Sequence, residues 1–230
     1  MLEIVKPSEL DLARDWCRAA FLLPATDGDR AQLPVTFSHH TQPATTMLRN
    51  WQSIQAEQTV GDEYSLDEIT FADPQGVLEL RCEVKSYHAY PAVEWVAYLK
   101  NTGTVDSAIL ADILPLDTLF PLEPALSCQV HHARGALTQR DDFEPLATPL
   151  TFRQGGSRLE LAARTGKSST LHLPFFNLQM GSGGVIGAIG WSGGWAATFQ
   201  RTRDGIRVRA GLARTFQNIR LFGSMSVFDN

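Results

Sequence analysis

The last third of the chain contains short apolar segments separated by glycine-rich turns. They cover residues 185–191, 195–201 and 206–212, and Asp204-Gly205 stands between the last two. Apolar runs bounded by Gly and Asp-Gly are typical of strands joined by hairpins. A pairing slip of one residue would turn the buried side of each strand towards water, so the register is well specified. This part of the chain therefore predicts antiparallel strands.

The cleanest alternation of apolar and charged residues lies earlier, in residues 78–85. Such a pattern predicts a strand with one buried and one exposed face. Residues 109–114 are apolar on both faces, which favours a central strand covered on both sides. Further strands are expected in residues 93–100, 126–133, 146–152 and 159–163.

These segments give roughly ten strands, and no helix-length periodic segment separates any two of them. Parallel βαβ units are therefore excluded. We expect a mainly β fold in which antiparallel strands form one large β-sandwich.

The N-terminal region has a different character. Ser8 is a good N-cap, and an apolar stripe from Leu12 to Leu23 predicts a short helix that Pro24 ends. Residues 25–46 are typical of a loop, and residues 47–54 predict a helical turn around Trp51. We expect a single domain over residues 1–230. Its lead-in is residues 1–46, its core residues 47–215, and its divergent tail residues 216–230.

Composition narrows the classes of function. The 230 residues carry a net charge of −5 without a block of like charges, which argues against nucleic acid or an anionic membrane as partner. Cys17, Cys82 and Cys128 have no paired or metal-type spacing, and such sparse cysteines fit a reducing compartment. The N-terminus lacks the features of a signal peptide. We expect a cytoplasmic protein.

The sharpest polar cluster, Arg140 to Pro145, lies between two expected strands and contains Asp141 and Asp142. It is either a solvated loop held by Arg–Asp pairs or a loop that presents carboxylates to a sugar or a partner domain. Carboxylates suit sugars because they accept hydrogen bonds from two hydroxyls at once. Trp191 and Trp195 flank Ser-Gly-Gly and offer ring faces to a sugar, although large rings at strand ends more often belong to the core. These four residues are the candidate substrate-binding set.

Other motifs give no catalytic, metal or cofactor site. Gly166-Lys167-Ser168 lacks the upstream glycine and the following helix of a phosphate loop. His131 and His132 are adjacent in an expected strand, so their side chains point to opposite faces. No nucleophile elbow or Cys–His arrangement stands out. We therefore expect no cofactor, no metal and no assignable catalytic residue.

Several segments resemble the N-terminal domain of glycoside hydrolase family 36, the α-galactosidase-like enzymes. The resemblance runs from about Met47 to Thr215, and the order of its pieces is more specific than any one of them. The pieces are Pro91 to Thr104 with Ile109 to Leu116, Asp141 to Leu146, Ser168-Ser169 with Leu173 to Leu178, and Gly190 to Trp195. The resemblance implies a large β-supersandwich, related in shape to galactose mutarotase.

In that family the domain precedes a (β/α)8 barrel, which alone takes about 250 residues and carries both catalytic aspartates. No Asp of this chain can be assigned either role. We therefore expect a truncated or frame-shifted product, or a detached sandwich.

The function that the resemblance implies is that of an accessory domain. It would support assembly and lend residues 135–146 to the rim of an α-galactoside site. Its partner is the barrel, or a second copy that covers an exposed apolar face.

Two alternatives stay open. One is a sugar epimerase, which needs a His and a carboxylate in one cleft, with His131 or His132 and Asp141 or Glu83 as candidates. The other is a lone sugar-binding module.

Overall fold

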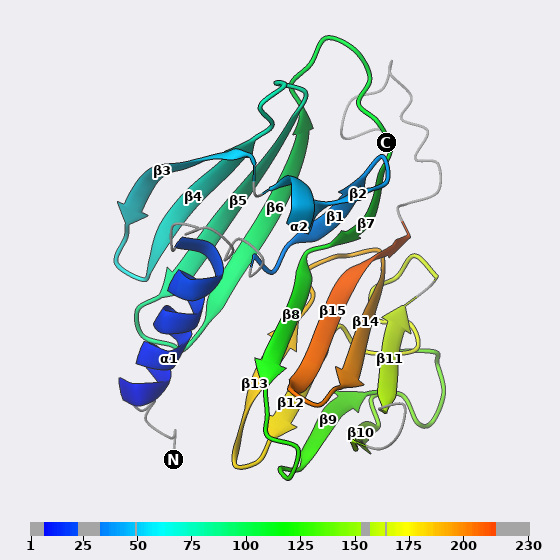
Figure 1. Ribbon diagram of the computed structural model, residues 1–230. Helices are drawn as coiled ribbons and strands as arrows, with labels where there is room; N and C mark the ends of the chain where they lie inside the picture. Colours follow the sequence, from blue (N-terminus) through cyan, green and yellow to red (C-terminus); the bar gives the residue numbers. More distant parts are fainter. Residues whose placement is uncertain (1–6, 23–32, 49, 153–156, 164, 215–230) are drawn as a thin grey trace. The chain divides into compact units, whose positions relative to one another are not determined.

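The computed structural model describes residues 7–22, 33–48, 50–152, 157–163 and 165–214. The chain divides into two compact units, residues 1–118 and 119–230. The described residues form mostly antiparallel strands, with one short helix near the N-terminus (Figure 1). The mainly β fold class is confirmed. The expected single domain and its boundaries stay predictions, and the tail from residue 216 lies outside the described residues.

The first unit is built on a four-stranded antiparallel sheet in the order β3-β4-β5-β6. A second, smaller sheet has the order β2-β1-β7. The strands of the two sheets are β1 (Thr36–His39), β2 (Gln42–Pro43), β3 (Gln52–Val60), β4 (Tyr64–Ala72), β5 (Leu78–Tyr87), β6 (Val93–Asn101) and β7 (Leu110–Leu114).

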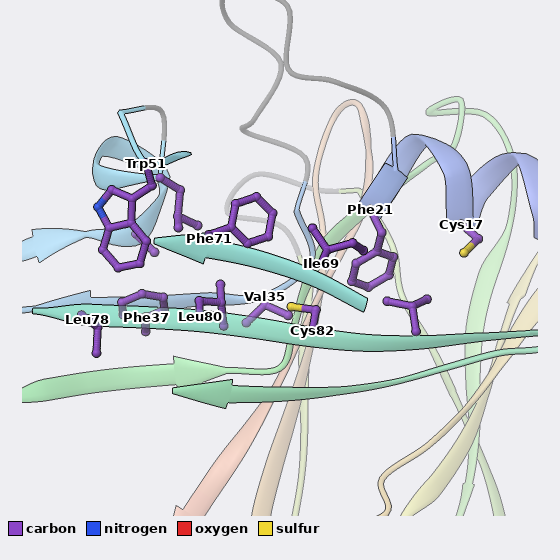
Figure 2. Packing of buried hydrophobic residues seen from close by; sticks show 13 residues of the cluster. Cys17, Phe21, Val35, Phe37, Trp51, Ile69, Phe71, Leu78, Leu80 and Cys82 are labelled. Carbon is purple, nitrogen blue, oxygen red and sulfur yellow. The ribbon is translucent and has the colours of Figure 1, made fainter. Parts of the chain in front are cut away.

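Strand β5 shows how the sequence sets the two faces of the larger sheet. Its apolar side chains at alternate positions are buried, and the charged ones between them are half-exposed. The buried face joins a core that includes Phe37, Trp51 and Phe71, and Figure 2 shows Cys17 and Phe21 reaching this core from the helical segment. The alternation in residues 78–85 therefore predicted the correct face of each residue.

The helical segment covers the same face of the sheet. It consists of α1 (Pro7–Cys17) followed by a single π-helical turn, η1 (Arg18–Leu22). Trp16 and Phe21 pack their rings against Trp95 of β6 at centroid distances of 5.7 and 5.6 Å. The indole Nε1 of Trp95 donates a hydrogen bond to the Pro115 carbonyl. These ring contacts therefore attach the helical segment to the inner face of β6.

The second unit contains two four-stranded sheets, in the orders β10-β9-β12-β13 and β11-β14-β15-β8. Phe176 of β12 and Phe199 of β14 meet edge to face at 4.7 Å, so the two sheets pack on each other as a sandwich. Its strands are β8 (Leu116–Pro121), which starts in the first unit, β9 (Cys128–Ala133), β10 (Pro145–Pro149), β11 (Arg158–Ala163), β12 (Phe175–Met180), β13 (Gly183–Ala188), β14 (Gly194–Arg201) and β15 (Gly205–Arg214).

Three local expectations were wrong or incomplete. The helical turn lies at α2 (Ala44–Met47), before the predicted residues 47–54, and β3 begins at Gln52. Strands β3 and β4 were not predicted. Strand β7 has two exposed residues, Ala111 and Asp112, and Ile109 beside it is 80% exposed. It lies at the edge of its sheet, so it is not the doubly covered strand that was expected.

Candidate functional site

The connection between β9 and β10, together with the first two residues of β10, is here called the 135–146 loop. It is held in shape by its own acidic residues. Both Asp142 carboxylate oxygens accept backbone hydrogen bonds, from Leu137 at 2.9 Å and Thr138 at 2.8 Å. The bond from Leu137 has the largest effect on the Asp142 carboxyl, and together these bonds lower the pKa of Asp142. Asp142 therefore acts as an internal cap that stays ionised.

The other two acidic residues share one cation. Arg134 Nε donates to Glu144 Oε2 at 2.9 Å and lies 3.3 Å from Asp141 Oδ2. All three side chains are about half exposed, and exposed ion pairs contribute only about 0–1 kcal/mol. The pairs therefore orient the loop more than they stabilise it. This arrangement matches the solvated loop held by Arg–Asp pairs.

The loop presents apolar side chains to solvent. Leu137 is 48% exposed and Phe143 is 59% exposed. Phe143 and Thr138 also have positive φ angles, of 66° and 63°, which cost residues with a Cβ about 1 kcal/mol or more. The loop therefore holds strained backbone while exposing a large ring.

Residues 168–171 connect this loop to the tryptophan region. Gly135 N donates to Leu171 O at 2.9 Å, and Ala136 N donates to Ser169 O at 2.8 Å. From the other side, Trp195 Nε1 donates to Ser168 O at 2.6 Å. Gly135 and Ala136 at the base of the loop, and Trp195 from the core, thus bond to backbone carbonyls of the same short segment.

The two tryptophans differ in exposure. Trp195 is 0% exposed and belongs to the core of β14, so its ring has no surface to offer a ligand. Trp191 is half-buried in the turn before β14. Of the four expected binding residues, Asp141 and Trp191 retain solvent access, Asp142 caps the loop, and Trp195 packs inside.

The adjacent histidines follow the alternation of β9. His132 is buried and bonds to Thr148 Oγ1 at 3.1 Å. Burial, with smaller effects of His172 and His131, lowers the pKa of His132 and keeps its ring neutral. His131 points to the opposite face. The partners of both rings are neutral side chains, in contrast to the His–carboxylate pair that an epimerase requires.

Sequence reasoning missed a polar cluster around His131. His131 Nε2 lies 2.8 Å from Gln179 Oε1, which also accepts from Gln129 Nε2 at 2.8 Å. Exposed Asn177 pairs with His131 across strands β12 and β9, and half-exposed Phe175 lies on the same face. Alternation in β9 places Gln129 and His131 on one face, but Gln179 joins them only through the strand register. This face of the sheet combines amides, an imidazole and an aromatic ring.

Among the described residues, no group of three or more His, Cys, Asp or Glu is arranged to hold a metal ion. Likewise, no helix in the described ranges has the length and apolar character needed to cross a membrane.

No family model and no curated protein matches the sequence. Solved structures do match. The GH36 α-galactosidase AgaA from Geobacillus stearothermophilus aligns with a TM-score of 0.54 and 16% identity, over 78% of this chain and 26% of that one. The chain shares the fold of part of a GH36 α-galactosidase. A variant of AgaA in complex with raffinose aligns equally well, at 17% identity over the same shares of both chains.

The α-galactosidase from Lactobacillus brevis gives a TM-score of 0.55 at 12% identity, over 82% of this chain and 27% of its own. This chain therefore spans about a quarter of the length of the α-galactosidases that it matches. The resemblance inferred from the sequence is confirmed at the level of the fold.

Proposed function

We propose that this chain is a non-catalytic accessory domain of the α-galactosidase type, acting in the cytoplasm. It supports the assembly of a catalytic (β/α)8 barrel and contributes the 135–146 loop to the rim of an α-galactoside site. Where the barrel is absent, a second copy of the chain covers the same surface.

The observation that carries this proposal is the construction of the 135–146 loop. Its carboxylates are engaged by Arg134 and by backbone amides, so they are not set up as a catalytic pair. Its apolar residues Leu137 and Phe143 are exposed on a strained backbone. A loop that is hydrogen-bonded at its base and exposes apolar side chains suits a contact surface better than a reacting group.

The direct test is co-expression with an α-galactosidase barrel encoded in the same genome. We expect the two polypeptides to co-purify and to hydrolyse raffinose together, while this chain alone does not. Phe143→Ser should reduce co-purification at least about tenfold, which is the size expected for losing an aromatic contact residue. Val60→Ser, at another exposed apolar position, is the matched control. Hydrolysis by the chain alone, or equal co-purification of both variants, would contradict the proposal.

A second candidate function is that of a stand-alone sugar-binding module. The cluster of Gln129, His131 and Gln179, with Phe175 on the same face, favours it. Planar amides beside an aromatic ring suit sugar hydroxyls and their apolar faces. Calorimetry with galactose and raffinose should then detect binding that Gln179→Ala abolishes and that Gln200→Ala, on exposed β14 surface, leaves intact. The absence of heat at millimolar sugar would leave only the assembly role.

A further inference from the structure

The first unit contains a cavity of about 590 Å³ between the helical segment and the inner face of the larger sheet. Its volume lies within the usual range of small-molecule sites, about 300–1,000 Å³. Its lining includes Cys17 and Leu22 of the helical segment and Ser65, Asp67, Ser86 and His88 of the sheet and its adjoining loop. None of them belongs to the 135–146 loop or to the His131 cluster, so the cavity is independent of the proposed function.

Asp67 is a buried acidic residue in the lining of this cavity. It occupies an inward-facing position of β4 and is only 2% exposed. Its Oδ1 atom is buried and has no hydrogen-bond partner among the described residues. Removing a carboxylate oxygen from water without a compensating donor is strongly unfavourable. A buried carboxylate oxygen of this kind, in the lining of a cavity of this size, therefore points to a donor that the described residues do not supply.

Ser65 and His88, in the same lining as Asp67, are hydrogen-bonded to each other. His88 Nδ1 donates to the Asp62 carbonyl at 3.2 Å, which leaves Nε2 of the neutral ring to accept a hydrogen bond from the Ser65 hydroxyl over 2.9 Å. The lone pairs of Ser65 Oγ remain open to a further donor. A ligand at this place thus meets a carboxylate and a hydroxyl oxygen that both accept.

The neighbouring hydroxyl, of Ser86, is hydrogen-bonded to a thiol. Burial raises the pKa of Cys17, and the nearby charge of Asp67 adds to this, while the hydrogen bond with Ser86 partly offsets both. Cys17 is therefore a thiol, and its Sγ lies 3.2 Å from Ser86 Oγ in a hydrogen bond that either atom can donate. In both directions Ser86 Oγ retains a lone pair for a further donor.

The charges around the cavity sum to a negative value. Three carboxylates, of Asp11, Asp15 and Asp67, face two guanidinium groups, of Arg14 and Arg18, so three negative against two positive charges leave −1. Arg14 already lies 4.0 Å from Asp11. The lining therefore favours a cation, and most strongly at the buried Asp67.

We propose that this cavity binds a small organic ligand through a protonated primary amine. The ammonium group donates to Asp67 Oδ1 and to the hydroxyl oxygens of Ser65 and Ser86. Its carbon chain lies against Leu22 and Cys17, the apolar part of the lining. Asp67 is the one buried carboxylate of this lining, with hydroxyls near it, while Asp11 and Asp15 are exposed. This arrangement matches an ammonium group better than a divalent metal ion.

The test measures thermal unfolding of the full chain with 1,4-diaminobutane at 10 mM. Two controls isolate the ammonium group: 1,4-butanediol has the same length without charge, and tetramethylammonium chloride at matched ionic strength has charge without N–H donors. We expect the diamine alone to raise the Tm by at least about 2 °C. No shift beyond these controls would overturn the proposal.

Asp67→Asn, which keeps the shape and removes the charge, should lower the affinity at least about tenfold. This variant should fold, because it removes a buried charge. Glu68→Gln, the next residue along β4 on the opposite face, should bind the diamine as the wild type does. Ser65→Ala is a second variant and should weaken binding several-fold. Unchanged diamine binding in both Asp67→Asn and Ser65→Ala would show that the amine binds elsewhere, and so reject the site.

Discussion

Trp195 donates a hydrogen bond of 2.6 Å from its indole Nε1 to the backbone carbonyl of Ser168, from a ring that is fully buried. The segment that begins at Ser168 also accepts hydrogen bonds from Gly135 and Ala136. The core of the second unit therefore positions the segment on which the 135–146 loop rests. Loop geometry and core packing are coupled through backbone atoms.

Replacing Trp195 by Phe should destabilise the protein by about 2–4 kcal/mol. The substitution leaves the Ser168 carbonyl without its donor and opens a void where the indole was. Chemical denaturation measures the change in the free energy of unfolding. Tyr90→Phe, at a 63% exposed position, should stay within about 0.5 kcal/mol of wild type. An equally small effect at Trp195 would show that the bond to Ser168 carries no stability.

A side chain at Gly135 should disturb the loop. A Cβ atom there would lie 2.0 Å from the Ser169 carbonyl oxygen and 2.8 Å from Leu171 N, both backbone atoms that cannot rotate away. Gly135→Ala should therefore cost about 1–3 kcal/mol or more. Gly190→Ala, where a Cβ meets nothing within 4 Å, is the matched control. Equal stability of the two variants would mean that the loop does not lie so close to residues 168–171.

The buried His132 should make the protein less stable in mild acid. Its pKa is lowered in the folded state by burial and by His172 and His131, so the unfolded chain binds the proton more readily. This contribution to stability is fully present above pH 6.5, the ordinary histidine pKa, and is lost as the pH falls towards the folded-state pKa. Denaturation curves between pH 7.5 and 5 test the direction.

His132→Gln should reduce that pH dependence, because glutamine cannot gain the proton. Exposed His40→Gln should leave it unchanged. If both variants follow the wild-type curve, another group governs the acid response.

The three cysteines should resist thiol reagents in the native protein. Cys17, Cys82 and Cys128 are all buried, and burial raises the pKa of Cys82 to about 12. Because the thiolate is the reacting form, labelling by iodoacetamide at pH 8 should be slow and should reach three sites only in denaturant. Mass spectrometry counts the labelled residues. Rapid native labelling of Cys82 would contradict the packing of β5.

Many of the strands could be predicted because their buried positions carry apolar residues at every second place in the sequence. In β5 each apolar residue at alternate positions is buried, and the hairpin of β14 and β15 turns at the predicted Asp204-Gly205. Strand β3, with the sequence Gln-Ser-Ile-Gln-Ala-Glu-Gln-Thr-Val, shows no such alternation. It is a strand because β4 pairs with it along its length, and cross-strand context outweighs local preference.

The same limit applies to the sites. The Arg140–Pro145 cluster predicted a polar loop. The sequence did not show that the Asp142 carboxylate accepts two backbone hydrogen bonds, whereas that of Asp141 pairs with Arg134. In β4 the inward-facing Asp67 interrupts an apolar face, and its chain neighbours do not reveal this. Cavities and clusters of this kind depend on which strands pair and in which register, and the sequence states neither.

At position 143 the left-handed backbone and a role in contact favour different residues. If position 143 were randomised, selection for thermal stability alone would enrich Gly and Asn, which tolerate a φ of 66° with less strain. Selection for a bound partner would instead restore an aromatic ring. The residues selected at position 143 in the two experiments would then show whether this loop is maintained for folding or for contact with a partner.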